Sequence, residues 1–352
     1  MSTPLTTGAS NGYRRIATEE AFAPPEILDR YRDLLRDGGG DRGFQSLWGF
    51  YLGSAAERPR SVVRKLADLG AERLADMDAH GIDHQILSLT TPGTQLFEVA
   101  EAVALARHVN DVAAQAVSDH PDRFTALAAV ALQDPAAAVT ELDRAVTRLG
   151  MRGLILNSHL QGRYLDDQEF WPVLEAAEAL DVPVYLHPNT PPDRMIGPLF
   201  DAGLDGAIYG FAVETAMHVM RIISSGVFDR YPRLRLVIGH LGEGLPFWIP
   251  RIDYFHNAQV VSGRYPSMKA VELRPSDYLR RNVWFTTSGM AWTPAIMFVR
   301  EVVGAERVLY AMDYPYQCVA DEVREQDALP IPPAELRAFY ESTAVDLFGL
   351  SS

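Results

Sequence analysis

Four residues with acidic or imidazole side chains each follow an apolar, strand-like run of the sequence. Glu19 comes after RRIAT, His187 after VPVYL, His240 after LRLVIG and Asp313 after RVLYAM. In a barrel of parallel strands, the carboxyl-terminal ends of all strands lie on one face, where barrel enzymes keep their catalytic groups. Two carboxylates and an imidazole on that face indicate a site for a divalent metal ion, with Glu19, His187 and Asp313 as ligands.

Structural roles for the same residues are the alternative. Asp313 could cap the helix that follows it, and a single histidine at a strand end is more often structural than metal-binding. We favour a ligand role for His187 because two strand-end acids accompany it. Glu20 adjoins Glu19 but faces the opposite side of the strand, since side chains alternate along a strand. We therefore expect Glu20 to form a salt bridge with a neighbouring side chain.

His240 and Glu243 form the motif HLGE directly after an apolar run, and three nearby glycines permit tight turns around them. A histidine that is oriented by a carboxylate is a pair that transfers protons. The alternative is that the glycines only turn the chain and that His240 caps a helix. Polar residues at other strand ends, Thr90 among them, are weaker candidates, because each is equally a turn residue.

Aromatic side chains and a guanidinium group occur together in the stretch GFQSLWGFYLGSAAERPR. Trp48, Phe50 and Tyr51 lie close to Arg58 in the sequence, a combination suited to a flat, anionic aromatic ligand. A contact between subunits or a small separate core would use the same residues. Arg251, further along in PFWIPRIDYF, could support the carboxylate of the HLGE motif or meet an anionic substrate.

Strand-like segments alternate with amphipathic helical stretches along the chain, which predicts parallel β/α units. The eight predicted strands are Arg15–Thr18, His84–Leu89, Thr125–Ala131, Gly153–Leu156, Val182–Leu186, Leu234–Ile238, Val283–Thr286 and Val308–Met312. The predicted helices are Val62–His80, Leu96–His120, Pro135–Leu149, Phe170–Leu180, Glu214–Ser224 and Pro294–Val303. With no linker and no repeat, the pattern predicts one α/β domain over residues 1–352, a (β/α)8 TIM-like barrel. We expect three long connections, 20–81, 188–233 and 241–282, to be inserted segments over the carboxyl-terminal mouth.

Composition and charge limit the classes of protein to which the chain can belong. Its 352 residues, 47% of them hydrophobic, suffice for a large barrel, and its net charge of −14 argues against a nucleic-acid partner. The single Cys318 excludes an intrachain disulfide. No signal-peptide pattern occurs, and no run of about 18 apolar residues could span a membrane. We expect a cytoplasmic protein with no membrane partner and a flexible N-terminus over residues 1–11.

Other motifs that would indicate a different chemistry are absent from the sequence. The first strand has no HxH pattern, and no strand ends in an evident lysine that could become a bridging carboxylate. A two-metal hydrolase centre is therefore poorly supported. The chain also lacks the glycine-rich loops that bind the phosphates of nucleotides, so we expect no organic cofactor.

The segments ATEEAF, YLHPN, IGHLGEGLPFWIPRID and YAMDYPY, in this order and spacing, resemble the decarboxylase branch of the amidohydrolase superfamily. The stretches RIATEEAFA, SLWGFY, NSHLQGRYLD and DAGLDGAIYGF are most similar to the 5-carboxyvanillate decarboxylases of that branch. The resemblance spans nearly the whole chain. It implies an amidohydrolase-type barrel and a carboxy-lyase of aromatic and lignin catabolism.

The resemblance also implies roles for individual residues. Glu19, His187 and Asp313 would bind one divalent metal ion, and His240 and Glu243 would act in catalysis. Many relatives carry a second metal-binding histidine where this chain has Ala21, which shifts the preference from Zn²⁺ toward Mn²⁺ or Mg²⁺. We expect Mn²⁺, with Zn²⁺ and Mg²⁺ as the alternatives. The full set of expected substrate contacts comprises Arg58, Arg251, Tyr316, Phe50, Tyr51, Trp48, Thr90 and His218.

The implied reaction is the non-oxidative decarboxylation of an ortho-hydroxy aromatic acid, 5-carboxyvanillate, to vanillate and carbon dioxide. A positioned acid would protonate the ring carbon that bears the carboxylate, with Asp313 as the first candidate and His240 with Glu243 as the second. A γ-resorcylate or 2,3-dihydroxybenzoate decarboxylase, a mononuclear metal hydrolase of lactones or amides, and a catalytically inactive binding barrel are the alternatives. By analogy with the family, we expect a homo-oligomer, a dimer or a tetramer.

Overall fold

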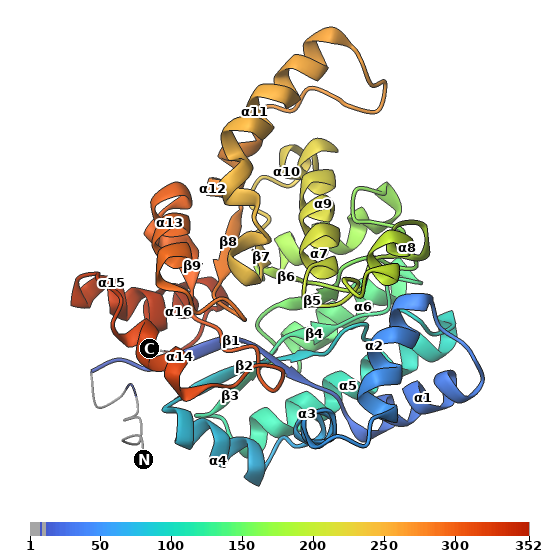
Figure 1. The fold of residues 1–352 in the computed structure, drawn as a ribbon, viewed down its shortest axis with the longest axis vertical. Helices are drawn as coiled ribbons and strands as arrows, with labels where there is room; N and C mark the ends of the chain where they lie inside the picture. Colours follow the sequence, from blue (N-terminus) through green and yellow to red (C-terminus); the bar gives the residue numbers. More distant parts are fainter. Residues whose placement is uncertain (1–7, 9–11, 352) are drawn as a thin grey trace.

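Short strands with almost wholly buried side chains form the centre of the computed structural model, which describes residue 8 and residues 12–351 (Figure 1). Parallel strands are covered by helices outside and by packed side chains inside, so both of their faces need apolar residues. The strands are β1 (Ile16–Phe22), β2 (His84–Leu89), β3 (Phe124–Ala126), β4 (Ala128–Ala129), β5 (Leu154–Asn157), β6 (Val184–His187), β7 (Leu236–Ile238), β8 (Val283–Thr286) and β9 (Val308–Leu309).

The strands close into a barrel. β1, β2 and β3 pair in parallel, as do β4 to β9 in chain order. Leu127, between β3 and β4, donates its amide to the carbonyl of Leu87 at 2.9 Å, so β3 and β4 are two parts of one barrel strand. The amide of Thr18 on β1 donates to the carbonyl of Tyr310, next to β9, at 3.1 Å and closes the ring. The predicted (β/α)8 barrel, with all eight predicted strands, is confirmed.

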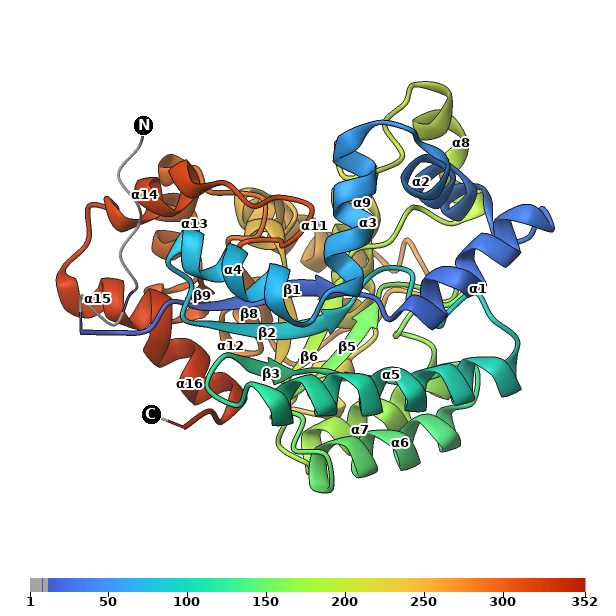
Figure 2. The same ribbon diagram turned by 90° about the horizontal axis from the view of Figure 1, so that it is seen from below.

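The helices surround this barrel, and Figure 2 shows α5, α6 and α7 side by side along its outside. The helices are α1 (Pro25–Arg36), α2 (Arg42–Gly53), α3 (Glu57–Ala67), α4 (Ala71–His80), α5 (Val99–Asp119), α6 (Pro135–Thr147), α7 (Trp171–Ala179), α8 (Asp193–Asp201), α9 (Gly210–Ser224), α10 (Val227–Arg230), α11 (Leu245–Ser262), α12 (Pro275–Arg281), α13 (Thr293–Val303), α14 (Ala320–Asp327), α15 (Pro333–Arg337) and α16 (Thr343–Phe348). Single-turn helices lie at Gln168–Phe170, His240–Gly242, Ala305–Arg307 and Ala338–Ser342.

One predicted helix is wrong as a single element. The span Val62–His80 consists of α3 and α4, which are separated near Asp68. The Asp68 carboxylate accepts hydrogen bonds from the amides of Gly70 at 3.0 Å and Arg73 at 3.1 Å. Such a carboxylate satisfies amides that have no partner at a helix start, so it favours a new helix over the continuation of the old one. The apolar periodicity continues across this break and therefore conceals it.

Two of the three long connections contribute to the barrel mouth, as expected. The connection after β1 contains α2 and α3, and the connection after β6 contains α8 and α9, which Figure 2 shows near one another at one end of the barrel. The third connection differs from the expectation, because its helix α11 projects away from the barrel body (Figure 1). The short turn before α11 packs against β8.

The segment 1–11, expected to be a flexible N-terminus, lies outside the described residues except for Gly8, whose amide donates to the Asp83 carboxylate at 2.9 Å. Within the described part of the chain, every helix is too short or too polar to cross a membrane. The single-domain organisation over residues 1–352 stays a prediction.

Candidate active site

A cavity of about 150 Å³ opens at the carboxyl-terminal ends of the strands. Its walls come from segments that are far apart in the sequence, namely α2, α3, α9 and the loops that follow β2, β6, β7 and β9. The lining residues are Leu47, Tyr51, Arg58, Thr91, His187, Ala207, Phe211, His240, Asp313, Tyr316 and Gln317. Six of the residues predicted from the sequence are therefore neighbours in this cavity.

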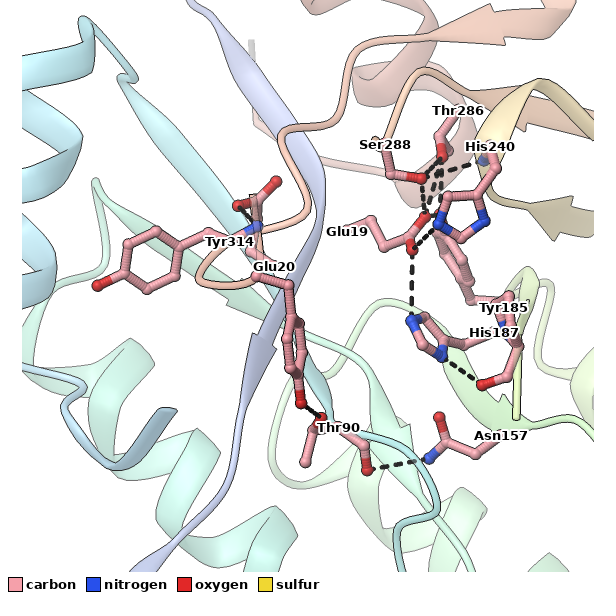
Figure 3. Close-up of polar contacts among 12 residues, drawn as sticks. Glu19, Glu20, Thr90, Asn157, Tyr185, His187, His240, Thr286, Ser288 and Tyr314 are labelled. Carbon is pink, nitrogen blue, oxygen red and sulfur yellow. Dashed lines mark hydrogen bonds and ion pairs between the residues drawn. The ribbon is translucent and has the colours of Figure 1, made fainter. Parts of the chain in front are cut away.

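Glu19, on β1, is buried beside the cavity and its two carboxylate oxygens have different surroundings. Oε2 accepts hydrogen bonds from the hydroxyls of Tyr185, Thr286 at 3.0 Å and Ser288 at 2.5 Å (Figure 3). Oε1 is buried and accepts no hydrogen bond. A buried, unpaired carboxylate oxygen is unfavourable by about 1–3 kcal/mol or more. The three hydroxyls thus hold the Glu19 carboxylate by Oε2 and leave Oε1 available to bind a cation.

His187, the last residue of β6, presents a ring nitrogen to that free oxygen. Its Nδ1 lies 2.8 Å from the carbonyl oxygen of Pro188, which can only accept, so Nδ1 carries the proton and Nε2 keeps a lone pair. Nε2 is 3.4 Å from Glu19 Oε1 (Figure 3). Burial lowers the pKa of His187, which keeps the ring neutral. Neutral imidazole with an orienting backbone carbonyl is the form that binds metals.

Asp313 reaches the same cavity from the loop after β9, and its backbone is in the left-handed region at φ 68°. A Cβ atom at Gly289 would lie 3.6 Å from Asp313 Oδ2 and 3.4 Å from His240 Cδ2, so both side chains approach one point at the end of β8. Burial, followed by the charge of Glu19, raises the pKa of the Asp313 carboxyl well above its usual range. A cation in the cavity would oppose this effect and favour the carboxylate.

The donor set fits one divalent cation. Glu19 Oε1 and His187 Nε2 point toward each other, neither is blocked by a strong internal hydrogen bond, and Asp313 lines the same space. Among the described residues, no three His, Cys, Asp or Glu side chains already stand together as a complete metal cluster. Two carboxylates and one imidazole are nevertheless the ligand types that Mn²⁺ and Mg²⁺ accept.

His240 and Glu243 form the expected pair in the turn after β7. His240 Nδ1 lies 2.7 Å from Glu243 Oε1, and His240 Nε2 lies 3.8 Å from Glu19 Oε1. Burial disfavours the imidazolium, but the charges of Glu243 and Glu19 outweigh burial and raise the pKa of His240 to about 10. His240, Leu241 and Glu243 all have φ between 52° and 55°. This turn directs the imidazole into the cavity. The left-handed conformation of these residues strains the backbone.

A guanidinium and two phenol rings line another part of the cavity. Arg58, on α3, is exposed and donates to the carbonyl of Tyr316 at 3.4 Å. The rings of Tyr51 and Tyr316 meet edge to face at 5.5 Å, and the Tyr316 hydroxyl lies 2.6 Å from Thr90 Oγ1. Thr90 is therefore a partner of Tyr316 and does not itself line the cavity. An aromatic surface next to a guanidinium suits an aromatic carboxylate.

Two aromatic residues of the same stretch lie elsewhere than expected. Trp48 is completely buried and donates its indole N–H to the carbonyl of Thr91 at 3.1 Å, so it supports the cavity wall from behind. Phe50 is 54% exposed and packs against Tyr51 on the outer side of α2. The helical period of 3.6 residues separates these neighbours in sequence onto different faces. Neither residue lines the cavity.

His218 and Arg251, two expected substrate contacts, are also placed outside the cavity. His218 is completely buried, with Nδ1 2.9 Å from Ser158 Oγ, and its Nε2 accepts the amide of Leu165 at 3.0 Å. Both ring nitrogens thus have partners inside the protein, and a substrate contact of His218 stays a prediction. Arg251 is exposed on the projecting helix α11, where its guanidinium lies 4.7 Å from the centre of the Phe255 ring.

The predicted salt bridge of Glu20 is also wrong. Its carboxylate is fully buried and accepts backbone amides instead, and no ion pair is formed by it among the described residues. Tyr185 and Thr286 were not expected at the site, although the strand period of two places Tyr185 on the same face as His187. Thr91, which also lines the cavity, belongs with Thr90 to the weaker strand-end candidates. The remaining lining residues carry no chemical signal in the sequence and are Leu47, Ala207, Phe211 and Gln317.

A parallel barrel with acids and imidazoles gathered at its carboxyl-terminal mouth has the architecture of barrel enzymes. The chain matches the family model for amidohydrolases over residues 59–350, and it belongs to the amidohydrolase family.

Several proteins similar to this chain are named decarboxylases. A γ-resorcylate decarboxylase of Rhizobium sp. (strain MTP-10005) is 35% identical over 344 residues, which cover 93% of this chain and 98% of the relative. The structure of 5-carboxyvanillate decarboxylase from Novosphingobium aromaticivorans DSM 12444, with manganese and 4-hydroxy-3-methoxy-5-nitrobenzoic acid, is 50% identical with a TM-score of 0.98 and covers 99% of this chain and 100% of that chain.

A dihydroxybenzoic acid decarboxylase from Polaromonas sp. JS666, with bound manganese and the inhibitor 2-nitroresorcinol, is 32% identical with a TM-score of 0.84 and covers 96% of this chain and 97% of that chain. These comparisons confirm the predicted family and the predicted class of enzyme, a carboxy-lyase. Both of these solved structures contain manganese, in agreement with the cofactor expected from the sequence.

Proposed function

We propose that this chain is a manganese-dependent, non-oxidative decarboxylase of ortho-hydroxy aromatic acids and that 5-carboxyvanillate is its substrate. The proposal depends chiefly on one observation, the presence of Arg58 in the same cavity as His187 and Asp313. 5-Carboxyvanillate has a second carboxylate, across the ring from its hydroxyl group, for which Arg58 supplies a cation. γ-Resorcylate has no such second carboxylate. The 50% identical neighbour, with its bound nitrobenzoic acid, supports the same choice.

Glu19, His187 and Asp313 are the residues that would hold the metal ion. When bound there, Mn²⁺ would neutralise charge on the carboxylate and phenolate oxygens of an ortho-hydroxy acid and orient its ring. Glu19 can serve as a ligand because Tyr185, Thr286 and Ser288 occupy only one of its two oxygens. Zn²⁺ and Mg²⁺ are the other metals that the donor set accepts.

Asp313 and His240 are the groups that we assign to proton transfer. Both line the cavity, and His240 is held by Glu243 at 2.7 Å. Asp313 takes a proton from the imidazolium of His240 or from solvent and delivers it to the ring carbon that bears the carboxylate. The bond to the carboxylate then breaks, its electron pair restores the aromatic ring, and carbon dioxide leaves. Direct protonation by His240 is the alternative, and an Asp313→Asn variant that still decarboxylates would favour it.

The test is an anaerobic reaction of 5-carboxyvanillate with the Mn²⁺-loaded protein. We expect vanillate and carbon dioxide, and in deuterated water one deuteron at the ring carbon that lost the carboxylate. Turnover of γ-resorcylate or 2,3-dihydroxybenzoate alone would change the substrate and leave the mechanism in place. Hydrolysis of lactones or amides without any decarboxylation would overturn the proposal in favour of a metal hydrolase. No reaction of either kind, in a correctly folded protein, would favour a binding barrel.

A homo-oligomer is the assembly that we propose for this enzyme, with α11 in the contact. Helix α11 projects from the barrel (Figure 1) and carries Phe247 and Trp248 near its start, both of which are more than half exposed. Tyr254 on the same helix and Trp292 before α13 are exposed as well. Large aromatic side chains gathered on a projecting element are typical of an interface. A second copy of this chain is the occupant we propose, and a cytoplasmic location remains a prediction.

A further inference from the structure

The carboxylate of Glu20 binds the two backbone amides that flank Asp313. Glu20 leaves β1 on the opposite side from Glu19 and lies beside Tyr314 (Figure 3). Its Oε1 accepts the amide of Met312 at 2.9 Å, and its Oε2 accepts the amide of Tyr314 at 3.3 Å. The two amides donate to different oxygens, so one side chain bridges the residues on either side of Asp313. Glu20 is therefore hydrogen-bonded to the backbone immediately before and immediately after Asp313.

The conformation of Asp313 needs such support. Its φ of 68° is in the left-handed region, which is unfavourable for residues with a Cβ atom, although Asp tolerates it better than most. β9 ends at Leu309, so the amides of Met312 and Tyr314 are beyond the regular ladder. The Glu20 carboxylate supplies acceptors in place of a neighbouring strand. Without these acceptors, two buried amides would lose their partners.

The remaining contacts of Glu20 hold its carboxylate in place. Gln85 on β2 donates its side-chain amide to Glu20 Oε2 at 3.4 Å. The guanidinium of Arg73 donates to Gln85 Oε1 at 3.1 Å and to the carbonyl of Ala21 at 2.6 Å. Glu20, Gln85 and Arg73 are all buried. A buried and fully bonded network of this kind fixes one geometry of its members.

We propose that Glu20 is a positioning residue, which fixes the backbone around Asp313 so that the Asp313 carboxylate is directed to the metal. The inference depends on the proposed function only in that Asp313 is taken as a metal ligand. The competing explanation is that Glu20 contributes to stability alone. The two explanations differ in one measurable respect, because a purely structural residue changes the melting temperature without a specific change in metal affinity or in the geometry of the bound ion.

The test compares Glu20→Gln with a matched control, Thr18→Val. Gln has the size of Glu but offers one acceptor, so one of the two amides faces an N–H donor. The Thr18 hydroxyl lies two residues away on β1 and donates to the carbonyl of Tyr310 at 2.8 Å. Thr18→Val therefore removes a hydrogen bond between the same two chain segments without touching the amides beside Asp313.

Mn²⁺ binding to each metal-free protein is followed by electron paramagnetic resonance, and the melting temperature is measured alongside. We expect Glu20→Gln to bind Mn²⁺ about 10- to 100-fold more weakly, as is usual when a supporting hydrogen bond of a ligand is lost, and to give an altered spectrum of the bound ion. Thr18→Val should keep the wild-type affinity and spectrum even if it melts earlier. Wild-type affinity and spectrum for Glu20→Gln would overturn the inference.

Two further outcomes are informative. If Glu20→Gln does not fold, Gln85→Leu, which removes the hydrogen bond that Gln85 donates to Glu20 together with the one that it accepts from Arg73, should weaken Mn²⁺ binding in the same direction, and an unchanged affinity would overturn the inference. If the wild-type protein itself binds no Mn²⁺, the proposed function fails and the positioning role fails with it. A wild-type protein that binds Mn²⁺ normally, beside an unaffected Glu20→Gln, would overturn the positioning role alone.

Discussion

The Nε2 atom of His187 lies 3.4 Å from the Oε1 atom of Glu19, across the interior of the barrel from β6 to β1. Glu19 Oε1 accepts no hydrogen bond although it is buried, and the proton of His187 is engaged by Pro188 on the other ring nitrogen. Two acceptors that face each other are unfavourable unless a cation or a proton lies between them. This relationship is the structural basis of the proposed metal site.

Replacing His187 by Ala should therefore remove metal from the protein. The supporting contacts of a ligand are worth about 10- to 100-fold in affinity, so loss of a ligand itself should weaken Mn²⁺ binding by more than about 100-fold. Metal content after dialysis is measured by mass spectrometry. His159→Ala is the control, because His159 also follows a strand but uses both ring nitrogens for contacts with Thr190 and Gly162. Equal loss of metal from both variants would contradict the assignment.

Arg58→Ala should raise KM for 5-carboxyvanillate by about 10-fold or more, since a charge-assisted pair with the second carboxylate is lost at an exposed position. KM for γ-resorcylate, which lacks that carboxylate, should change little. Steady-state kinetics with both acids provide the comparison. Arg60→Ala is the matched control, because Arg60 is exposed on the same helix but does not line the cavity. Identical kinetics for Arg58→Ala and the wild type would place Arg58 outside the substrate site.

Glu214→Gln should make thermal stability less dependent on pH. Burial raises the pKa of Glu214 to about 8 from an ordinary value of 4.5, although Ser158 and Thr215 donate hydrogen bonds to it. Between pH 4.5 and 8 the folded protein keeps this proton and the unfolded chain does not. Wild-type stability therefore falls as pH rises through this window.

Gln is neutral at every pH, so the variant does not lose this part of its stability as the pH rises. We therefore expect it to melt at least about 2 °C above the wild type near pH 8. Near pH 5 the two proteins should melt at more similar temperatures. Scanning calorimetry at several pH values measures the difference, and other titrating groups cancel in the comparison. The exposed Glu175→Gln on α7 should follow the wild type at every pH. If the melting temperatures of Glu214→Gln and the wild type differ by the same amount at pH 5 and at pH 8, the raised pKa of Glu214 does not affect stability as expected.

Trp248→Glu should shift the protein from an oligomer toward a monomer of 39.0 kDa, because a charge would be buried in the proposed contact between copies. Sedimentation velocity over a range of concentrations measures the change. Val99→Glu, at an exposed apolar position on α5 away from α11, is the control and should keep the wild-type distribution. A wild-type protein that is monomeric at all concentrations would show that α11 does not form such a contact.

The sequence by itself was sufficient for the barrel, because apolar runs of strand length alternating with amphipathic stretches leave few other arrangements. The strand-end position of Glu19, His187 and Asp313 likewise follows from the chain alone once the barrel is assumed. The ends of the helices were harder to predict from the sequence, as the break near Asp68 illustrates. There, a local hydrogen bond ended a helix whose apolar period continued.

Tertiary structure alone decided which side chains share the cavity and which oxygen of Glu19 remains free. Trp48, Phe50 and Tyr51 are neighbours in sequence, yet the turn of α2 sends one into the core, one to solvent and one to the cavity. Glu20 was expected in a salt bridge, but its partners are amides that the ring closure of the barrel brings to it from the far end of the chain. Sequence pattern determines the face of an element on which a residue lies, whereas its partners depend on contacts between distant segments that form only when the barrel closes.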